Sequence, residues 1–254
     1  NEPILSGELR TRAISLVADD AVVIHVSDVV DLALDCFFPR ICVGCGRIGS
    51  YICAPCEASL PFLVGSLCPK CGQPQISGIL CPACATHSSH ITAIRSVFRF
   101  EGTVRDAVHE LKYRNLRAIA PALAGYIAVC MTKADITADV IVPVPLHRAH
   151  HKRRGYNQAA LLAHEVGRVR GIPVLPHSLR RKGDGASQAR TRNVEERRRN
   201  VQHAFECAGG IFANTSVLLI DDVCTTGATL ESCATALRTA GATEVYALTV
   251  AREV

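Results

Sequence analysis

The chain has 254 residues, which is enough for one good-sized domain and a small one. It is 48% hydrophobic and 20% charged, a globular composition, and no run of about 18 uncharged apolar residues could form a membrane span. The formal net charge of +5 is too mild to identify a nucleic-acid-binding protein by itself.

The first element expected along the chain is an amphipathic helix within 21–38, at the end of an N-terminal extension, 1–38. Apolar residues dominate this stretch, and it is interrupted by His25, Asp28, Asp31 and Asp35. The first twenty residues carry acidic side chains and have no apolar centre, unlike a secretory signal. Thirteen cysteines in a chain without export features indicate a reduced, cytoplasmic compartment and metal binding instead of disulfides.

Residues 39–86 form the second expected module, a double zinc ribbon. Its eight cysteines make four CxxC pairs: Cys42 and Cys45, Cys53 and Cys56, Cys68 and Cys71, Cys81 and Cys84. A tight CxxC turn brings two thiolates to one tetrahedral ion. The segment has few large apolar residues, so zinc would supply the stability that a core cannot. Because four sulfur ligands leave no open position, we expect about two structural zinc ions.

The spacing leaves the pairing of the four CxxC motifs open. Sequential quartets would join the first pair to the second and the third to the fourth, whereas a crossed arrangement would join the first to the third. We favour the sequential arrangement, because a CxxCG motif followed by a CxxC motif occurs twice. Redox activity and iron–sulfur ligation are weaker alternatives for this spacing.

Residues 91–254 alternate between strand-like and helix-like patterns. Strands are expected at 94–100, 139–144, near Leu175, at 217–220 and at 245–251. Helices are expected at 103–113, 117–133, 159–170 and 230–239. This alternation predicts an α/β fold, with a mostly parallel sheet and helices on both faces.

The most informative motif begins with the apolar strand at 217–220. Two carboxylates, Asp221 and Asp222, follow it, and then comes a small hydroxyl-rich loop before a helix: Thr225, Thr226, Gly227, Ala228 and Thr229. A helix amino end with threonine hydroxyls and a glycine suits a phosphate, while the carboxylates suit sugar hydroxyls or a metal ion. We therefore expect a phosphorylated-sugar site, in preference to an ordinary strand, turn and helix with acids at the turn. The Walker and dinucleotide glycine motifs are absent.

Two basic segments accompany this motif. Residues 180–199 hold eight Lys or Arg against three acids, and 147–154 holds four Lys or Arg with three histidines. Such runs are usually solvated faces, but here their Lys and Arg side chains could bind the phosphates of a ligand that carries several. The small residues at 183–187 offer little to pack, as in a mobile lid.

The order of motifs from Phe98 to Arg252 resembles the ComF family of phosphoribosyltransferase-like proteins. The matching motifs are LKY at 111–113, PVPLH at 143–147, RRGYNQA at 153–159, Gln188, Arg197 with Asn200, Ala204 with Phe205, and IDDVCTTGATL at 220–230. The cysteine-rich segment is similar to the double zinc ribbon that precedes this domain in the family. The resemblance implies the type I phosphoribosyltransferase fold.

The resemblance also implies roles for individual residues. Thr225–Thr229 would hold the 5-phosphate of phosphoribosyl pyrophosphate, and Asp221 and Asp222 the ribose hydroxyls. A pyrophosphate loop would comprise Leu146, His147 and Arg148, and a closing hood would contain Arg181, Gln188, Arg197 and Asn200. Lys112 and Arg154 are further candidates for anion contact, although a solvated helix end explains Lys112 nearly as well.

The resemblance leaves two classes of function. One is a magnesium-dependent phosphoribosyltransferase with an unidentified acceptor, in which Asp221, Asp222, Arg181 and Arg197 serve catalysis. Thr225 stands where purine phosphoribosyltransferases usually have an acid, and a hydroxyl is a poor general base. The other is a sensor of phosphoribosyl pyrophosphate or ribose 5-phosphate that contacts nucleic acid or a partner protein. The family also implies a link to natural competence, the uptake of single-stranded DNA. Possible partners are therefore single-stranded DNA or a protein of the competence machinery.

Overall fold

The structure is a computed structural model, which describes residues 39–182, 204–207 and 210–254. The chain divides into two units, Asn1–Arg40 and Ile41–Val254, and the architecture below is that of the second. The helix expected at 21–38 lies outside the described residues, as does most of the basic segment 180–199. None of the helices in the described ranges is long and apolar enough to cross a membrane.

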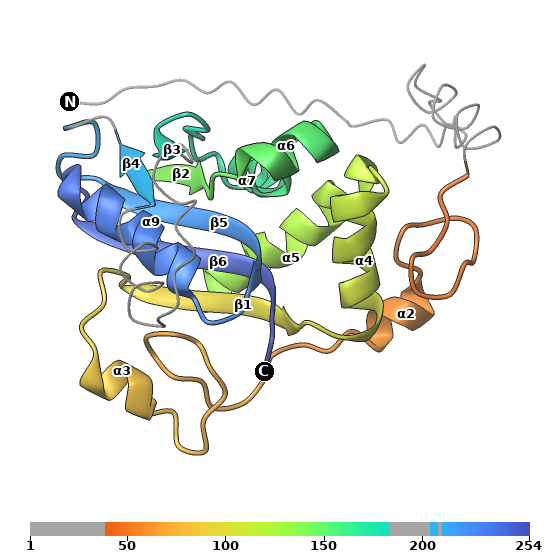
Figure 1. Cartoon of the computed structure of the whole chain (residues 1–254). Helices are drawn as coiled ribbons and strands as arrows, with labels where there is room; N and C mark the ends of the chain where they lie inside the picture. Colours follow the sequence, from red (N-terminus) through yellow and green to blue (C-terminus); the bar gives the residue numbers. More distant parts are fainter. Residues whose placement is uncertain (1–38, 183–203, 208–209) are drawn as a thin grey trace, which may run out of the picture. The chain divides into compact units, whose positions relative to one another are not determined.

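A four-stranded sheet forms the centre of the second unit (Figure 1). Its strands are, in spatial order, β1 (Ala93–Arg99), β6 (Glu244–Arg252), β5 (Ser216–Cys224) and β2 (Val140–Pro143), and every neighbouring pair is parallel. This confirms the parallel sheet. The strand expected near Leu175 is reduced to one bridge between Ile141 and Val174. A separate antiparallel pair joins β3 (Leu179–Arg181) to β4 (Phe205–Cys207).

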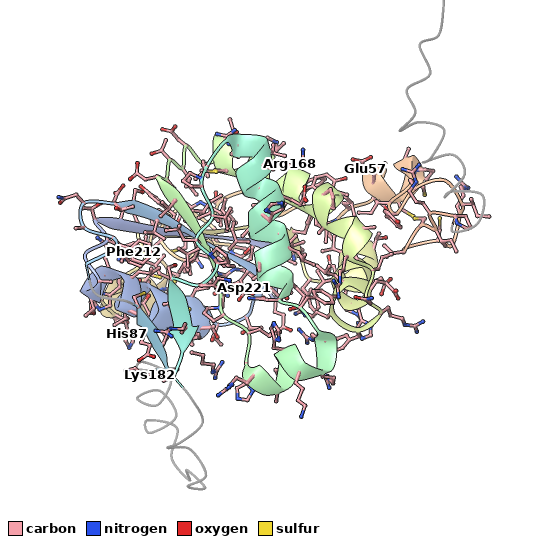
Figure 2. All side chains as sticks on the ribbon, turned by 90° about the horizontal axis from the view of Figure 1, so that it is seen from above. Glu57, His87, Arg168, Lys182, Phe212 and Asp221 are labelled. Atoms are coloured by element: carbon pink, nitrogen blue, oxygen red, sulfur yellow. The ribbon has the colours of Figure 1, made fainter. Side chains whose placement is uncertain are left out.

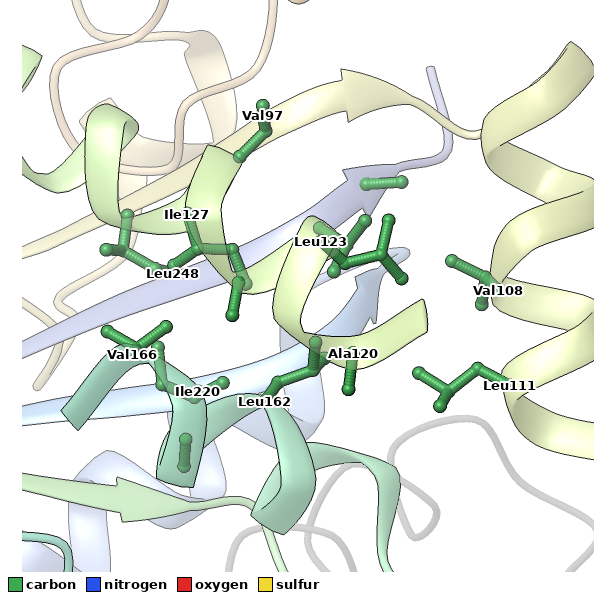
Figure 3. Close-up of a cluster of buried hydrophobic side chains, with 14 of the residues drawn as sticks. Val97, Val108, Leu111, Ala120, Leu123, Ile127, Leu162, Val166, Ile220 and Leu248 are labelled. Carbon is green, nitrogen blue, oxygen red and sulfur yellow. The ribbon is translucent and has the colours of Figure 1, made fainter. Parts of the chain in front are cut away.

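Helices cover both faces of the sheet, as the alternation predicted. The described helices of this domain are α4 (Gly102–Tyr113), η1 (Arg117–Ile119), α5 (Ala120–Lys133), α6 (Arg148–Arg154), α7 (Gln158–Arg170) and α9 (Ala228–Thr239). Leu218 and Ile220 of β5 pack in a cluster with α4, α5 and α7, which Figure 3 shows. Val217 and Leu219 pack in a second cluster with α9. Alternate residues of a strand thus serve opposite faces.

Helix α6 was not expected from the sequence. His147 caps its amino end, because the ring Nδ1 accepts a hydrogen bond from the Ala149 N–H at 3.2 Å. Gly155 ends it with φ of 77°, a left-handed conformation that glycine adopts without strain. Seven mostly polar residues carry no apolar periodicity, which explains why the pattern of the sequence did not reveal this helix.

The cysteine-rich segment covers the β1 edge of the sheet. Its short helices are α2 (Ala54–Ala58) and α3 (Pro82–Thr86). The link between the two ribbons pairs with β1: the Leu63 N–H donates to the Val97 carbonyl at 2.9 Å, and the Arg99 N–H to the Pro61 carbonyl at 2.8 Å. An edge strand would otherwise expose unpaired backbone groups. The ribbons thus contact the sheet domain through backbone hydrogen bonds. The boundary between the two modules stays a prediction.

Candidate functional site

Asp221 and Asp222 lie in adjacent positions of β5. The strand continues to Cys224, because its pairing with β6 runs on to Arg252. The sequence predicted a strand that ends before the two carboxylates, whereas the structure places them inside the strand. The Asp222 N–H donates to Asp221 Oδ1 at 2.8 Å. Since successive side chains of a strand point to opposite faces, the two carboxyl groups serve different sides of the sheet.

Lys112, at the carboxyl end of α4, forms an ion pair with Asp222. Its Nζ lies 2.6 Å from Asp222 Oδ1, and the two side chains are only 19% and 11% exposed. A solvated helix end is thus not the role of Lys112. The pair brings a cation to the same carboxylate that was expected to bind a sugar hydroxyl.

The pKa of the other carboxyl group, that of Asp221, is raised. Burial first, and then the neighbouring Asp222 carboxylate, raises the pKa of Asp221 to about 8, although Lys112 and the Asp222 N–H oppose this rise. A ligand that brings its own positive charge, such as a metal ion, would favour ionisation of Asp221.

The loop after β5 combines exposed threonine hydroxyls with the start of a helix. Thr225, Thr226, Ala228 and Thr229 are exposed. Gly227 is the N-cap residue of α9, with φ of 80°, and a Cβ there would lie 3.4 Å from Ile94 Cδ1. The first amides of a helix have no partner within the helix. The Ala228 N–H donates within the loop to Thr226 Oγ1 at 3.3 Å. The threonine hydroxyls and the other N–H groups at the start of α9 are the donors that the loop could offer to an anion.

The loop after β2 lies beside the end of β5, because the Val144 N–H donates to the Ile220 carbonyl at 2.9 Å. Asn157 Nδ2 donates to the Val144 carbonyl at 2.9 Å and fixes the return of the chain. Leu146 and His147 are partly exposed and Arg148 is exposed. The predicted pyrophosphate loop thus begins two residues after the contact between Val144 and Ile220, the residue that precedes the carboxylate pair.

Arg154 and Tyr113 join α6 to α4. The Arg154 guanidinium lies 4.9 Å from the centre of the Tyr113 ring, and its Nε has no hydrogen-bond partner in the described part of the chain. Tyr113 follows Lys112 directly, so the two predicted cations lie at neighbouring positions around one helix end. Sequence reasoning did not single out Tyr113, since a contact between an arginine and an aromatic ring has no local pattern.

The predicted hood is described only in part. Arg181 ends β3, with its guanidinium 5.5 Å from the centre of the Phe205 ring. Gln188, Arg197 and Asn200 lie outside the described residues. The hood residues therefore stay a prediction.

Figure 2 shows Asp221 toward the middle of the unit and Glu57 on α2.

The eight ribbon cysteines gather in two groups, each with its sulfur atoms within 4.8 Å of one another. One group contains Cys42, Cys45, Cys53 and Cys56, and the other contains Cys68, Cys71, Cys81 and Cys84. This is the sequential arrangement. Burial would raise the pKa of Cys42, but N–H donors led by that of Cys53 outweigh it and lower the pKa to about 6. Four clustered sulfurs with thiolate-stabilising donors fit a closed, structural zinc site.

Comparisons with known proteins assign both modules to families. Residues 33–85 match the double zinc ribbon domain, and residues 111–253 match the phosphoribosyl transferase domain. The second match spans more than half of the chain and includes Lys112, Asp221, Asp222 and the loop to Thr229.

Three curated relatives are similar over most of their length. Competence protein ComFC of Bacillus subtilis is 27% identical over 79% of this chain and 84% of its own. The DNA utilization protein YhgH of Salmonella typhimurium is 31% identical over 76% of this chain and 87% of its own. Competence protein F of Haemophilus influenzae is 34% identical over 57% of this chain and 66% of its own.

Proposed function

Because the chain belongs to the ComF family of phosphoribosyltransferase-domain proteins with an N-terminal double zinc ribbon, we propose that it binds phosphoribosyl pyrophosphate and transfers its ribosyl group. One observation carries this proposal. A carboxylate pair in β5 leads directly into an exposed, hydroxyl-rich loop whose left-handed Gly227 caps the amino end of α9. These two parts suit a polyol and a phosphate that are covalently joined.

The 5-phosphate would lie in the loop Thr225–Thr229. The ribose would lie across the end of β5, with one hydroxyl donating to Asp222 on the α4 side and another to Asp221 on the α9 side. Lys112 already neutralises Asp222, so a bound sugar has to share that carboxylate with the ammonium group. Charge-assisted hydrogen bonds of this kind are worth roughly 1.5–3 kcal/mol each. The same ammonium group favours an anionic ligand and disfavours a cationic one.

Transfer would proceed by departure of pyrophosphate, with His147, Arg148 and Arg154 on the side where its charge builds. Magnesium, for which carboxylate oxygens are suitable ligands, would add stabilisation of that charge when bound with the pyrophosphate. Arg181 and Arg197 would close over the same group from the hood. Thr225 is no general base, so the acceptor is one that loses no proton to this position.

The acceptor class follows from the relatives only in outline. Their names refer to competence and to DNA utilization, which supports a role in the uptake or processing of DNA. The second candidate function is a sensor that binds the sugar phosphate without turnover and contacts single-stranded DNA or a competence protein. The hydroxyl of Thr225, in place of an acid, favours this candidate.

Calorimetry with phosphoribosyl pyrophosphate and magnesium tests the binding site. Replacing both Asp221 and Asp222 by Asn keeps their shape but removes their charge, and affinity should fall at least about tenfold. The matched control is Asp139→Asn, because Asp139 Oδ2 accepts from the Ser216 N–H at the opposite end of β5. Equal affinity in the double variant and the control would place the ligand elsewhere.

Pyrophosphate release separates the enzyme from the sensor. Replacing Arg181 and Arg197 by Ala should reduce release per bound ligand far more than affinity, because closure matters most as the ribosyl cation develops. A sensor would release no pyrophosphate above background with any acceptor. Release that survives both substitutions would contradict the role of the hood.

A further inference from the structure

The two ribbons contact different parts of the domain. In the first ribbon, a Cβ on Gly44 would lie 2.5 Å from Thr103 Oγ1, in the first turn of α4. Glu57 of α2 accepts a hydrogen bond from the Tyr126 hydroxyl on α5 at 2.6 Å. Thr103 and Lys112 lie near opposite ends of α4, so the first ribbon adjoins the end away from the site.

The second ribbon contacts the sheet itself (Figure 1, amber, below β1 and α9). The Ile94 N–H donates to the Lys70 carbonyl at 2.7 Å. A Cβ on Gly72 would lie 2.5 Å from the Ile94 carbonyl oxygen, so only glycine allows this approach. Arg252, at the end of β6, donates from Nη2 to the carbonyl of Cys71.

The same two sheet residues adjoin the sugar-phosphate loop, Cys224–Glu231. Ile94 Cδ1 is 3.4 Å from the Cβ position of Gly227. Arg252 is the ladder partner of Cys224, and the Glu253 N–H donates to the Cys224 carbonyl at 3.1 Å. Ile94 therefore lies between the second ribbon and Gly227 of the loop, and Arg252 lies between the second ribbon and Cys224.

A third connection runs through the segment that follows the second ribbon. The Ser89 hydroxyl and the His90 N–H each donate to a carboxylate oxygen of Glu231 at 2.6 Å. Glu231 lies in the first turn of α9, and its own N–H donates to the Gly227 carbonyl at 2.9 Å. Lys70 Nζ donates to the Ser89 carbonyl at 3.3 Å and ties this segment to the ribbon.

Arg252 brings a buried positive charge to the contact between the second ribbon and the loop. It is 2% exposed, its Nε has no hydrogen-bond partner, and no acidic side chain in the described ranges pairs with it. A buried guanidinium without a counter-charge is costly. Four thiolates around one Zn²⁺ carry net negative charge, and Cys71 belongs to that set. With zinc bound, the second site would supply the negative charge that Arg252 lacks among the described side chains.

We propose that metal in the second ribbon holds the loop Cys224–Glu231 in its ligand-binding conformation, with Arg252 and Glu231 as positioning residues. Among the described residues the first ribbon shows no such connection, and its contacts are with α4 and α5. The inference rests on the proposed function, since it assigns the sugar phosphate to this loop. Loss of the second metal would leave Arg252 uncompensated and release the loop's support.

Matched ligand substitutions in the full chain test this coupling. Cys84→Ser and Cys45→Ser should each remove about one zinc ion by metal analysis. Cys84→Ser should weaken ribose 5-phosphate binding at least about tenfold in calorimetry and speed amide exchange at 224–231. Cys45→Ser should leave both within about twofold. Equal effects of the two variants, or zinc loss in Cys84→Ser with unchanged loop exchange, would overturn the proposal.

Glu231→Gln tests the same coupling with all ribbon thiols intact, and so covers the case in which Cys84→Ser does not fold. We expect unchanged zinc content and about fivefold weaker binding, because Gln has only one acceptor oxygen: one of the two charge-assisted bonds from Ser89 and His90 is lost and the other becomes neutral. Glu244→Gln is the control, since Glu244 contacts only the local Tyr246 hydroxyl among described side chains. Unchanged exchange at 224–231 in Glu231→Gln would contradict the coupling. A wild type that binds no ribose 5-phosphate would refute the proposed function, while the exchange comparison would still decide the coupling.

Discussion

The two zinc ribbons share one local pattern and differ in what surrounds them. Gly46 and Gly72 each follow the second cysteine of a CxxC motif, with φ of 74° and 71°. A Cβ on Gly46 would meet nothing within 4 Å, whereas one on Gly72 would meet the Ile94 carbonyl oxygen at 2.5 Å. A repeated motif therefore predicts a repeated metal site, but each copy acquires its role from the surface against which it packs.

The largest expected effect separates these two glycines. Both Gly46→Ala and Gly72→Ala force alanine into a left-handed conformation, which costs about 1–2 kcal/mol. Gly72→Ala must also move a backbone carbonyl of β1, so we expect it to lower the free energy of unfolding by about 3 kcal/mol or more. Urea unfolding of both variants measures the difference. Equal losses would mean that the second ribbon does not pack on β1 as described.

The next effect uses the pH dependence of binding as a reporter of the loop. With the pKa of Asp221 raised to about 8, its carboxylate forms only as the pH rises toward that value. Ribose 5-phosphate affinity should therefore rise on the order of tenfold between pH 6 and pH 8 in wild type and in Gly46→Ala. In Gly72→Ala the rise should occur at lower pH, because water reaches the carboxyl group.

Asp221→Asn is the control for this profile. Ionisation of the ligand's own phosphate near pH 6 is common to all variants, so the difference from Asp221→Asn isolates Asp221. A profile identical in wild type and Asp221→Asn would show that Asp221 does not titrate in this range. Calorimetry over the pH series gives the affinities.

A smaller effect concerns the link between the ribbons. The Phe62 ring centre lies 4.7 Å from that of Phe98 and 6.1 Å from that of Tyr126. Phe62→Leu should lower the free energy of unfolding by about 1 kcal/mol, because ring pairs add to the burial of area. Val64→Ala, at a side chain 79% exposed, should change it by less than about 0.5 kcal/mol. Weaker sugar-phosphate binding in Phe62→Leu would extend the second ribbon's role to this link.

The smallest effect tests the first ribbon. Tyr126→Phe removes the hydrogen bond to the exposed Glu57 carboxylate and should cost about 0.5–1 kcal/mol in chemical unfolding, with sugar-phosphate affinity unchanged. Tyr246→Phe is the control, because its hydroxyl contacts Glu244 two residues away in the same strand. A tenfold loss of affinity in Tyr126→Phe would break the distinction between the ribbons.

Parts of the candidate site could be predicted because their signals are local. The carboxylates, the threonine loop and the start of α9 are contiguous, and the CxxC pairs are defined by spacing alone. Helix α6 was missed because polar residues over seven positions carry no periodicity. Gln188, Arg197 and Asn200 stay predictions from the family pattern.

The sequence by itself determined the α/β class, the parallel sheet, the family and the positions of two metal motifs, since each is written in short-range patterns of polarity and spacing. Only the tertiary structure decided that Lys112 pairs with Asp222, that Glu231 accepts from Ser89 and His90, and that Arg252 reaches Cys71. These partners lie more than a hundred residues apart in the chain. Their contacts depend on how the sheet, its helices and the ribbons pack together, which no local pattern records.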